Sequence, residues 1–267
     1  MAWQWASAAF HRFNLLAGFA AQLAFFLALT LMPFVAVTVT MAGRLLPLEV
    51  TTEIEQVLGD VLPAETRVDP ADVFRWARSS ASTGWLTASF FLAVATSFNF
   101  IATGLRGIRA AVTGEVKPDD TPWRSTLSAA LLVVVWIVTL LATALLLILE
   151  PSVERGLLSL HELADVTISL VAATRVGVVA AMLFGATFLT YRLAPIPRPP
   201  AGRTVVAALL TPSGWLLVSH GFSKVAPELW GGAQIYGTIG SVVLFLIWAY
   251  LNAWTILLGS LLLIRRH

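Results

Sequence analysis

The chain has 267 residues, of which 58% are hydrophobic and 12% are charged, whereas soluble domains carry roughly 25% charged residues. This composition excludes an ordinary soluble domain and favours a protein whose surface faces lipid. The net charge of +2 does not indicate a nucleic-acid partner, and the absence of cysteine excludes disulfides and thiolate metal sites.

The N-terminal segment, residues 1–14, mixes aromatic and polar side chains and precedes an apolar run from Leu15 to Gly43. The apolar core of a cleaved signal peptide has roughly 7–15 residues, so this longer run is predicted to be a retained first membrane span. Residues 1–14 are predicted to form a short helix that lies in the membrane interface and enters the first span through an elbow.

Membrane-spanning helices are predicted at six places along the chain. A bilayer core of about 30 Å requires roughly 20 apolar residues in a helix, because backbone polar groups in lipid must be bonded within the segment. The predicted spans are about Ala17–Ala42, Trp85–Leu105, Ser125–Leu149, a fourth that starts between Val166 and Ala172 and ends at Tyr191, Thr204–Phe222 and Tyr236–Ile264. We therefore expect an all-α polytopic membrane protein in which residues 1–267 form a single membrane domain.

The longest polar segment, residues 44–84, separates the first two predicted spans. Its apolar residues recur at helical spacing, and they are Val50, Ile54, Val57, Leu58 and Val61. Pro63 ends that helix, and Asp69 followed by Pro70 is typical of the start of another. The segment is therefore predicted to be an extramembrane pair of amphipathic helices.

The distribution of charge predicts the orientation in the membrane. With both termini inside and Arg175 left aside, the inner segments carry ten basic and three acidic residues, and the outer segments carry six basic and twelve acidic residues. Because lysine and arginine are enriched in cytoplasmic loops, both termini are predicted to be cytoplasmic and residues 44–84 to be periplasmic.

Three short blocks of sequence carry a resemblance to a known family. The first is Ala20–Phe26 with Pro33, the second is Tyr191–Pro195 with Gly202, and the third is Tyr236–Gly240 with Trp248, Tyr250 and Gly259. Their order and spacing, over nearly the whole chain, resembles the YihY/BrkB family of bacterial inner-membrane proteins, which was once labelled ribonuclease BN. Many members follow the last glycine with Ala-Glu, whereas this chain has Ser260 and Leu261, so any role of that carboxylate is absent or moved.

The resemblance implies a six-helix fold in a bacterial inner membrane. Envelope maintenance, serum resistance and export have been suggested as roles of the family, and the ribonuclease label is regarded as mistaken. The resemblance implies little about a substrate.

Polar residues inside the predicted spans are the candidate functional site. In the fifth span Ser213, His220 and Lys224 are spaced by seven and four residues and share one helical face. The other candidates are Gln22, Asn99, Thr103, Ser241, Trp248 and Asn252. Because polar groups in lipid are costly and usually face a bundle interior, these residues are predicted to line a shared polar cavity. Ordinary packing, in which small and hydroxyl-bearing residues join neighbouring helices, is the alternative.

Arg175 is the one charged residue that falls near or inside a predicted span. If the fourth span starts at Val166, Arg175 lies deep and requires an acidic partner such as Glu150 or Asp165. If the span starts near Ala172, the side chain snorkels to the interface, which is the interpretation we favour. His161–Asp165 resembles a zinc-protease helix, but the second ligand position is aspartate, so no metal, cofactor or catalytic residues are predicted.

The polar stripes, the proline-interrupted spans and the lack of catalytic motifs favour a transporter or exporter of an amphiphilic or anionic envelope-related molecule. A structural or scaffolding protein of the cell envelope is the alternative, and an enzyme, a ribonuclease included, is least favoured. The expected partners are membrane lipids and an unidentified small-molecule or lipid substrate, with a second copy of the chain as a further option and no nucleic acid.

Overall fold

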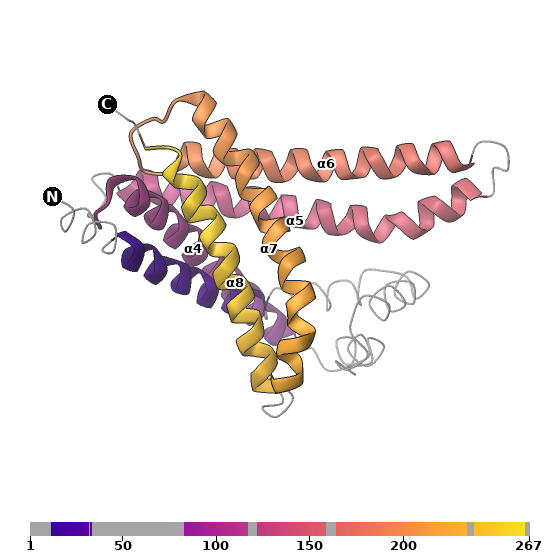
Figure 1. Ribbon diagram of the computed structural model, residues 1–267, viewed down its shortest axis with the longest axis horizontal. Coiled ribbons are helices and arrows are strands. Elements are labelled where there is room, and N and C mark those ends of the chain that lie inside the picture. The colour runs from indigo at the N-terminus through magenta and orange to yellow at the C-terminus, as the bar shows by residue number, and fades with distance from the viewer. Residues whose placement is uncertain are drawn as a thin grey trace. The chain divides into compact units, whose positions relative to one another are not determined.

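The computed structural model describes residues 12–31, 33, 83–116, 122–158, 164–233 and 238–264, and within these ranges it contains helices and short connections but no β-strand. An N-terminal helix, Arg12–Leu31, comes first. The labelled helices that follow are α4 (Thr83–Thr113), α5 (Pro122–Leu158), α6 (Ala164–Leu193), α7 (Ala201–Ala233) and α8 (Thr238–Leu261) (Figure 1). The prediction of an all-α fold is confirmed.

Within these described ranges, six helical segments are long and apolar enough to cross a membrane, each with 20 to 27 residues. They are Arg12–Leu31, Thr87–Thr113, Pro122–Thr143, Ala173–Leu193, Ala201–Ala226 and Val242–Leu261. This number confirms the six predicted spans. Residues 1–11 of the predicted interfacial helix lie outside the described residues, and so do residues 44–82 of the predicted amphipathic pair.

The chain divides into two compact units, and each of α4, α5 and α6 passes from one unit to the other. Unit 1 comprises Met1–Ala28, Ser97–Thr139 and Gly177–His267, and unit 2 comprises Leu29–Thr96 and Leu140–Val176. Unit 2 therefore holds the first part of α4, the second part of α5 and the first part of α6. The site described below lies entirely in unit 1.

One apolar cluster of unit 1 joins the N-terminal helix to α4 and α8. Its buried residues are Leu16, Phe19, Ala20, Leu23, Ala110, Ala111, Ala253 and Leu257. Glycine at position 107 lets the three helices approach, because a Cβ there would lie 2.9 Å from Leu257 Cδ2 and 3.3 Å from Phe19 Cβ. Small residues at such contacts allow the close backbone packing that stabilises helices in lipid.

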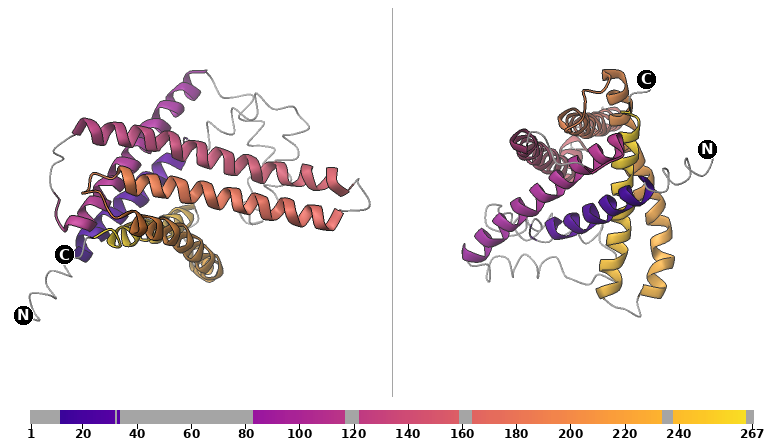
Figure 2. Two further views of the ribbon diagram at one scale, coloured as in Figure 1. Left: turned by 90° about the horizontal axis from the view of Figure 1, so that it is seen from above. Right: turned by 90° about the vertical axis from the view of Figure 1, so that its left-hand side faces the viewer.

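A second apolar cluster of unit 1 joins α4 to α5, α6 and α7. Its buried residues include Leu105, Ile108, Leu132, Tyr191 and Ala207. At its edge the indole Nε1 of Trp136 in α5 donates a hydrogen bond of 3.1 Å to the hydroxyl of Thr190 in α6. Helices α7 and α8 run side by side in opposite directions, as Figures 1 and 2 show. Sequential helices are therefore neighbours in unit 1.

The end of α4 is closed by a glycine and an arginine. Gly114 has φ 78°, a left-handed conformation that favours glycine, and its N–H bonds to the Ala110 carbonyl at 2.8 Å. The Arg12 guanidinium lies beside Gly114, where an added Cβ would be 3.0 Å from Arg12 Nη2. A cation is favourable at a helix C-terminus, so Arg12 links the start of the N-terminal helix to the end of α4.

Candidate functional site: a polar seam of helices α6, α7 and α8

Buried and half-buried polar side chains lie along the contacts of α6, α7 and α8 in unit 1. We call this group the polar seam, and it consists of Tyr191, Thr211, Ser219, Trp248 and Asn252. Polar groups inside lipid-embedded helices are costly unless they bond to one another. In the seam, hydrogen bonding therefore joins α6, α7 and α8 in addition to apolar packing.

Tyr191, near the end of α6, forms one end of the seam and is fully buried. Its hydroxyl donates a hydrogen bond of 2.9 Å to the Ile256 carbonyl of α8. The same hydroxyl lies 2.7 Å from Thr211 Oγ1 in α7, and because its single proton is used on the carbonyl, Thr211 is the donor of that bond. One side chain thus joins three helices.

Gly259 on α8 provides the space that Tyr191 and Thr211 occupy. An added Cβ at this position would lie 2.5 Å from the Tyr191 hydroxyl and would also overlap Thr211 Oγ1. The next residue, Ser260, is fully buried and donates 2.6 Å to the Leu257 carbonyl. A residue larger than glycine at position 259 is therefore incompatible with this junction as it stands.

The other part of the seam lies further along α7 and α8. The indole Nε1 of Trp248 donates 3.1 Å to Ser219 Oγ across the two helices. One helical turn on, the Asn252 side-chain nitrogen Nδ2 donates 2.8 Å back to the Trp248 carbonyl. These bonds join an indole to a hydroxyl across the α7–α8 pair and fix an amide one turn further along α8.

The amide of Asn252 is only half satisfied. The residue is 6% exposed, and its Oδ1 atom has no hydrogen-bond partner among the described residues. A buried acceptor that lacks a donor costs about 1–3 kcal/mol. Asn252 therefore presents an acceptor inside the bundle that no part of the described structure uses.

The predicted cavity residues fall into two groups. Thr103 is fully buried and accepts a hydrogen bond of 3.0 Å from Arg106 Nη2, while Trp248 and Asn252 belong to the seam. The side chains that are exposed on their helices are those of Gln22, Asn99, Ser213, His220 and Lys224. The side chain of Ser241 lies outside the described part. That these residues share one cavity stays a prediction.

The exposed residues of α7 keep the common face that their spacing predicted. Ser213 and His220 are surrounded by exposed leucines, and Leu216 and Leu217 are 67% and 74% exposed. The Ser213 hydroxyl donates 2.9 Å to the Leu209 carbonyl of its own helix. Such back-bonding is a common way for a hydroxyl to be satisfied in a membrane helix.

Arg175 lies at the start of the apolar segment Ala173–Leu193 and is half-buried. The predicted snorkelling of its side chain stays a prediction. Among the described residues no group of three or more His, Cys, Asp or Glu could hold a metal ion. The zinc-like stretch around His161 lies outside the described side chains.

Sequence reasoning missed the junction of Tyr191, Thr211 and Gly259 as a unit. Tyr191 and Gly259 were named only as members of two separate blocks that carry the family resemblance, and Thr211 was not named. A usable signal was present, since both blocks surround polar or small residues in otherwise apolar spans. Which residues face one another depends on the rotation of each helix, and a single sequence does not give that rotation.

The described residues form six apolar helices, and buried hydrogen bonds join α6 to α7 and α8, which defines a multi-pass helical membrane protein. The family model described as "Virulence factor BrkB" matches residues 10–264, and the protein belongs to that family, as the resemblance predicted. The chain is 25% identical over 240 residues to the "Putative ribonuclease-like protein YfkH" of Bacillus subtilis (strain 168). The matched region covers 90% of this chain and 86% of that protein. No solved structure matches.

Proposed function

We propose that this protein is a transporter or exporter of an amphiphilic or anionic envelope-related molecule in the bacterial inner membrane, and that it is not an enzyme. The observation that carries the proposal is the buried Asn252 carbonyl oxygen, which lacks a donor among the described residues. Asn252 bonds to the carbonyl of Trp248, one helical turn away, and the indole of Trp248 bonds to Ser219 across the apolar pair of α7 and α8. An intramembrane amide in that position is more consistent with a binding site than with packing.

The cost of burial supports this interpretation. The hydroxyls of Tyr191 and Thr211 bond to each other, that of Tyr191 also bonds to the Ile256 carbonyl, and that of Ser219 accepts from the Trp248 indole, so they stabilise the bundle without needing a ligand. Asn252 differs, because satisfying its Oδ1 requires a donor from water or from a bound molecule. We propose that the amide contacts the cargo and that the predicted cavity, including His220 and Asn99, continues from it.

Replacing Asn252 by leucine tests the proposal. The variant should lose transport, because the acceptor is removed, yet it should fold at least as well as the parent, since an unpaired polar atom leaves the core. Transport is measured in sealed proteoliposomes, with a headgroup-labelled anionic phospholipid and a small organic anion as separate probes. Unfolding is followed in parallel.

Asn14→Leu makes the same chemical exchange at an exposed position and should leave transport unchanged. A packing role for Asn252 would give the opposite pattern, with lower stability and no separate loss of flux. A parent protein that moves neither probe would contradict transport of these classes and favour the scaffolding alternative.

The orientation of the chain forms a separate prediction. Reporters fused after His267 and near Asp119 should report the cytoplasm, and a reporter near Glu65 should report the periplasm, because arginines concentrate on the side of the termini. Paired reporters that are active only in the cytoplasm or only in the periplasm provide the measurement. A periplasmic C-terminus would contradict the predicted topology.

A further inference from the structure

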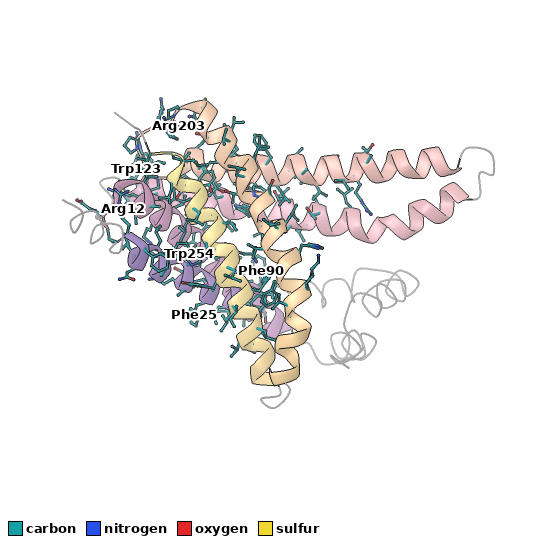
Figure 3. The ribbon with its side chains drawn as sticks, viewed as in Figure 1. Arg12, Phe25, Phe90, Trp123, Arg203 and Trp254 are labelled. Carbon is teal, nitrogen blue, oxygen red and sulfur yellow. The ribbon has the colours of Figure 1, made fainter. Side chains whose placement is uncertain are left out.

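One end of unit 1 is strongly basic. We call it the basic end, and it consists of Arg12, Arg106, Arg109, Arg124, Arg192 and Arg203, which lie near the beginnings or ends of their helices, and of Arg198, which lies between α6 and α7. Within the described ranges, the only acidic residue at this end is Glu115. Figure 3 shows Arg12 and Arg203 gathered at the same end as Trp123. The positive charge of this end is therefore largely unbalanced by acidic side chains of the described chain.

Two of these guanidinium groups are held in place by the protein. Arg203 Nη1 donates to the Ile264 carbonyl just beyond α8. Arg106 donates through Nε to the Ala102 carbonyl at 3.3 Å and through Nη2 to Thr103 Oγ1 at 3.0 Å. A guanidinium has five N–H donors, so each group keeps donors that these bonds do not use. Fixed guanidinium groups lose less entropy when they bind an anion.

Aromatic rings lie close to two of these arginines, Arg12 and Arg124. Phe13 stacks on Trp254 with ring centroids 5.2 Å apart, and Tyr250 meets Trp254 edge-on at 6.3 Å. Phe13 follows Arg12 directly and is 57% exposed. Trp123 is 63% exposed, with the Arg124 guanidinium 5.2 Å from its ring centre. Tryptophan and tyrosine favour the headgroup level of a bilayer.

We infer that the basic end is a binding surface for the phosphate of an anionic phospholipid, with Arg12 and the adjoining stacked pair of Phe13 and Trp254 as its principal seat. Arginine pairs with phosphate through two parallel N–H···O bonds, and the exposed aromatic faces contact the upper acyl chain. The lipid acts here as a bound partner rather than as cargo. The inference is therefore independent of the transport proposal.

Arg12→Gln tests the inference. The full-length protein is placed in nanodiscs with equal amounts of phosphatidylglycerol and phosphatidylcholine, and the lipids retained after release are counted by native mass spectrometry. The parent should retain phosphatidylglycerol preferentially. Arg12→Gln should lower this preference about five-fold, which corresponds to the contribution expected of one arginine near a charged surface, and Arg203→Gln should lower it by a similar factor.

Arg175→Gln is the matched control. Arg175 lies near the start of the apolar segment Ala173–Leu193, whereas Arg192 of the basic end lies near its other end, so the removal of Arg175 should leave the lipid preference unchanged. Equal retention of both lipids by the parent, or an equal loss in Arg175→Gln, would overturn the inference.

Two further measurements separate the inference from its competitors. Thermal unfolding in nanodiscs of phosphatidylcholine alone shows whether Arg12→Gln is folded. If that variant is unfolded, the lipid preference of Arg203→Gln decides whether the inference holds. Glycerol phosphate serves as a soluble probe of the same chemistry. It should not displace phosphatidylglycerol at equal concentration, and full displacement would indicate a site for free phosphates instead of a lipid surface.

Discussion

Gly259→Ala should destabilise the protein strongly, although alanine is the better helix former. Helix propensity alone predicts a gain of roughly 1 kcal/mol. The added Cβ, however, would lie 2.5 Å from the Tyr191 hydroxyl and would overlap Thr211 Oγ1, and overpacking of this kind costs about 1–3 kcal/mol. Because the overlap is severe, we expect a cost near the upper end of that range and a net loss of about 2 kcal/mol, measured by denaturant or thermal unfolding in bicelles.

Gly185→Ala is the control for Gly259→Ala. Gly185 lies on α6 in the same unit, and a Cβ added there meets no atom within 4 Å. This exchange should leave stability unchanged or raise it slightly. Equal stability of the two variants would show that the junction of Tyr191, Thr211 and Gly259 does not exist in the membrane.

Tyr191→Phe should be the second most damaging exchange. It removes the donor to the Ile256 carbonyl and the acceptor used by Thr211. Interhelical hydrogen bonds in membrane proteins contribute on average about 0.6 kcal/mol and at most about 1.7 kcal/mol, so a loss of roughly 1–2 kcal/mol is expected for the two together. Equilibrium unfolding, in the conditions used for Gly259→Ala, provides the measurement.

The two exchanges should also be coupled. In the Gly259→Ala background, Tyr191→Phe removes one of the two atoms that the Cβ meets, so it should cost less than in the parent and the pair should be less than additive. Thr211→Ala should relieve the same variant further, whereas Thr211→Val, which keeps the bulk, should not. Strict additivity of Gly259→Ala and Tyr191→Phe would contradict direct contact.

The spans were predictable from the sequence because lipid sets a simple rule of length and polarity. Each predicted span corresponds to a helix, but the helices begin or end elsewhere, as α5 shows by continuing through Pro151 to Leu158. Beyond the apolar segment, the end of a helix depends on capping and on contacts outside the bilayer. The hydropathy of the chain does not contain this information.

The candidate site was predictable only in part. Trp248 and Asn252 were identified from the cost of polar groups in lipid, and the structure joins them to α7 through Ser219. Ser219 itself carried no signal, since a serine in a membrane helix most often bonds to its own backbone. His220 and Asn99 are exposed on their helices, which shows that equal polarity in the sequence does not imply an equal position in the fold.

Access of water to the polar seam tests the central claim most directly. The chain contains no cysteine, so Asn252→Cys and Leu251→Cys each introduce a single thiol into an otherwise unchanged protein. Because only the ionised thiol reacts and ionisation requires a hydrated site, a membrane-impermeant charged thiol reagent reports water at each position. We expect Asn252→Cys to be modified in sealed vesicles while Leu251→Cys, exposed on the outer face of α8, stays unmodified. An unreactive thiol at position 252 in folded protein would contradict a transport site at the polar seam.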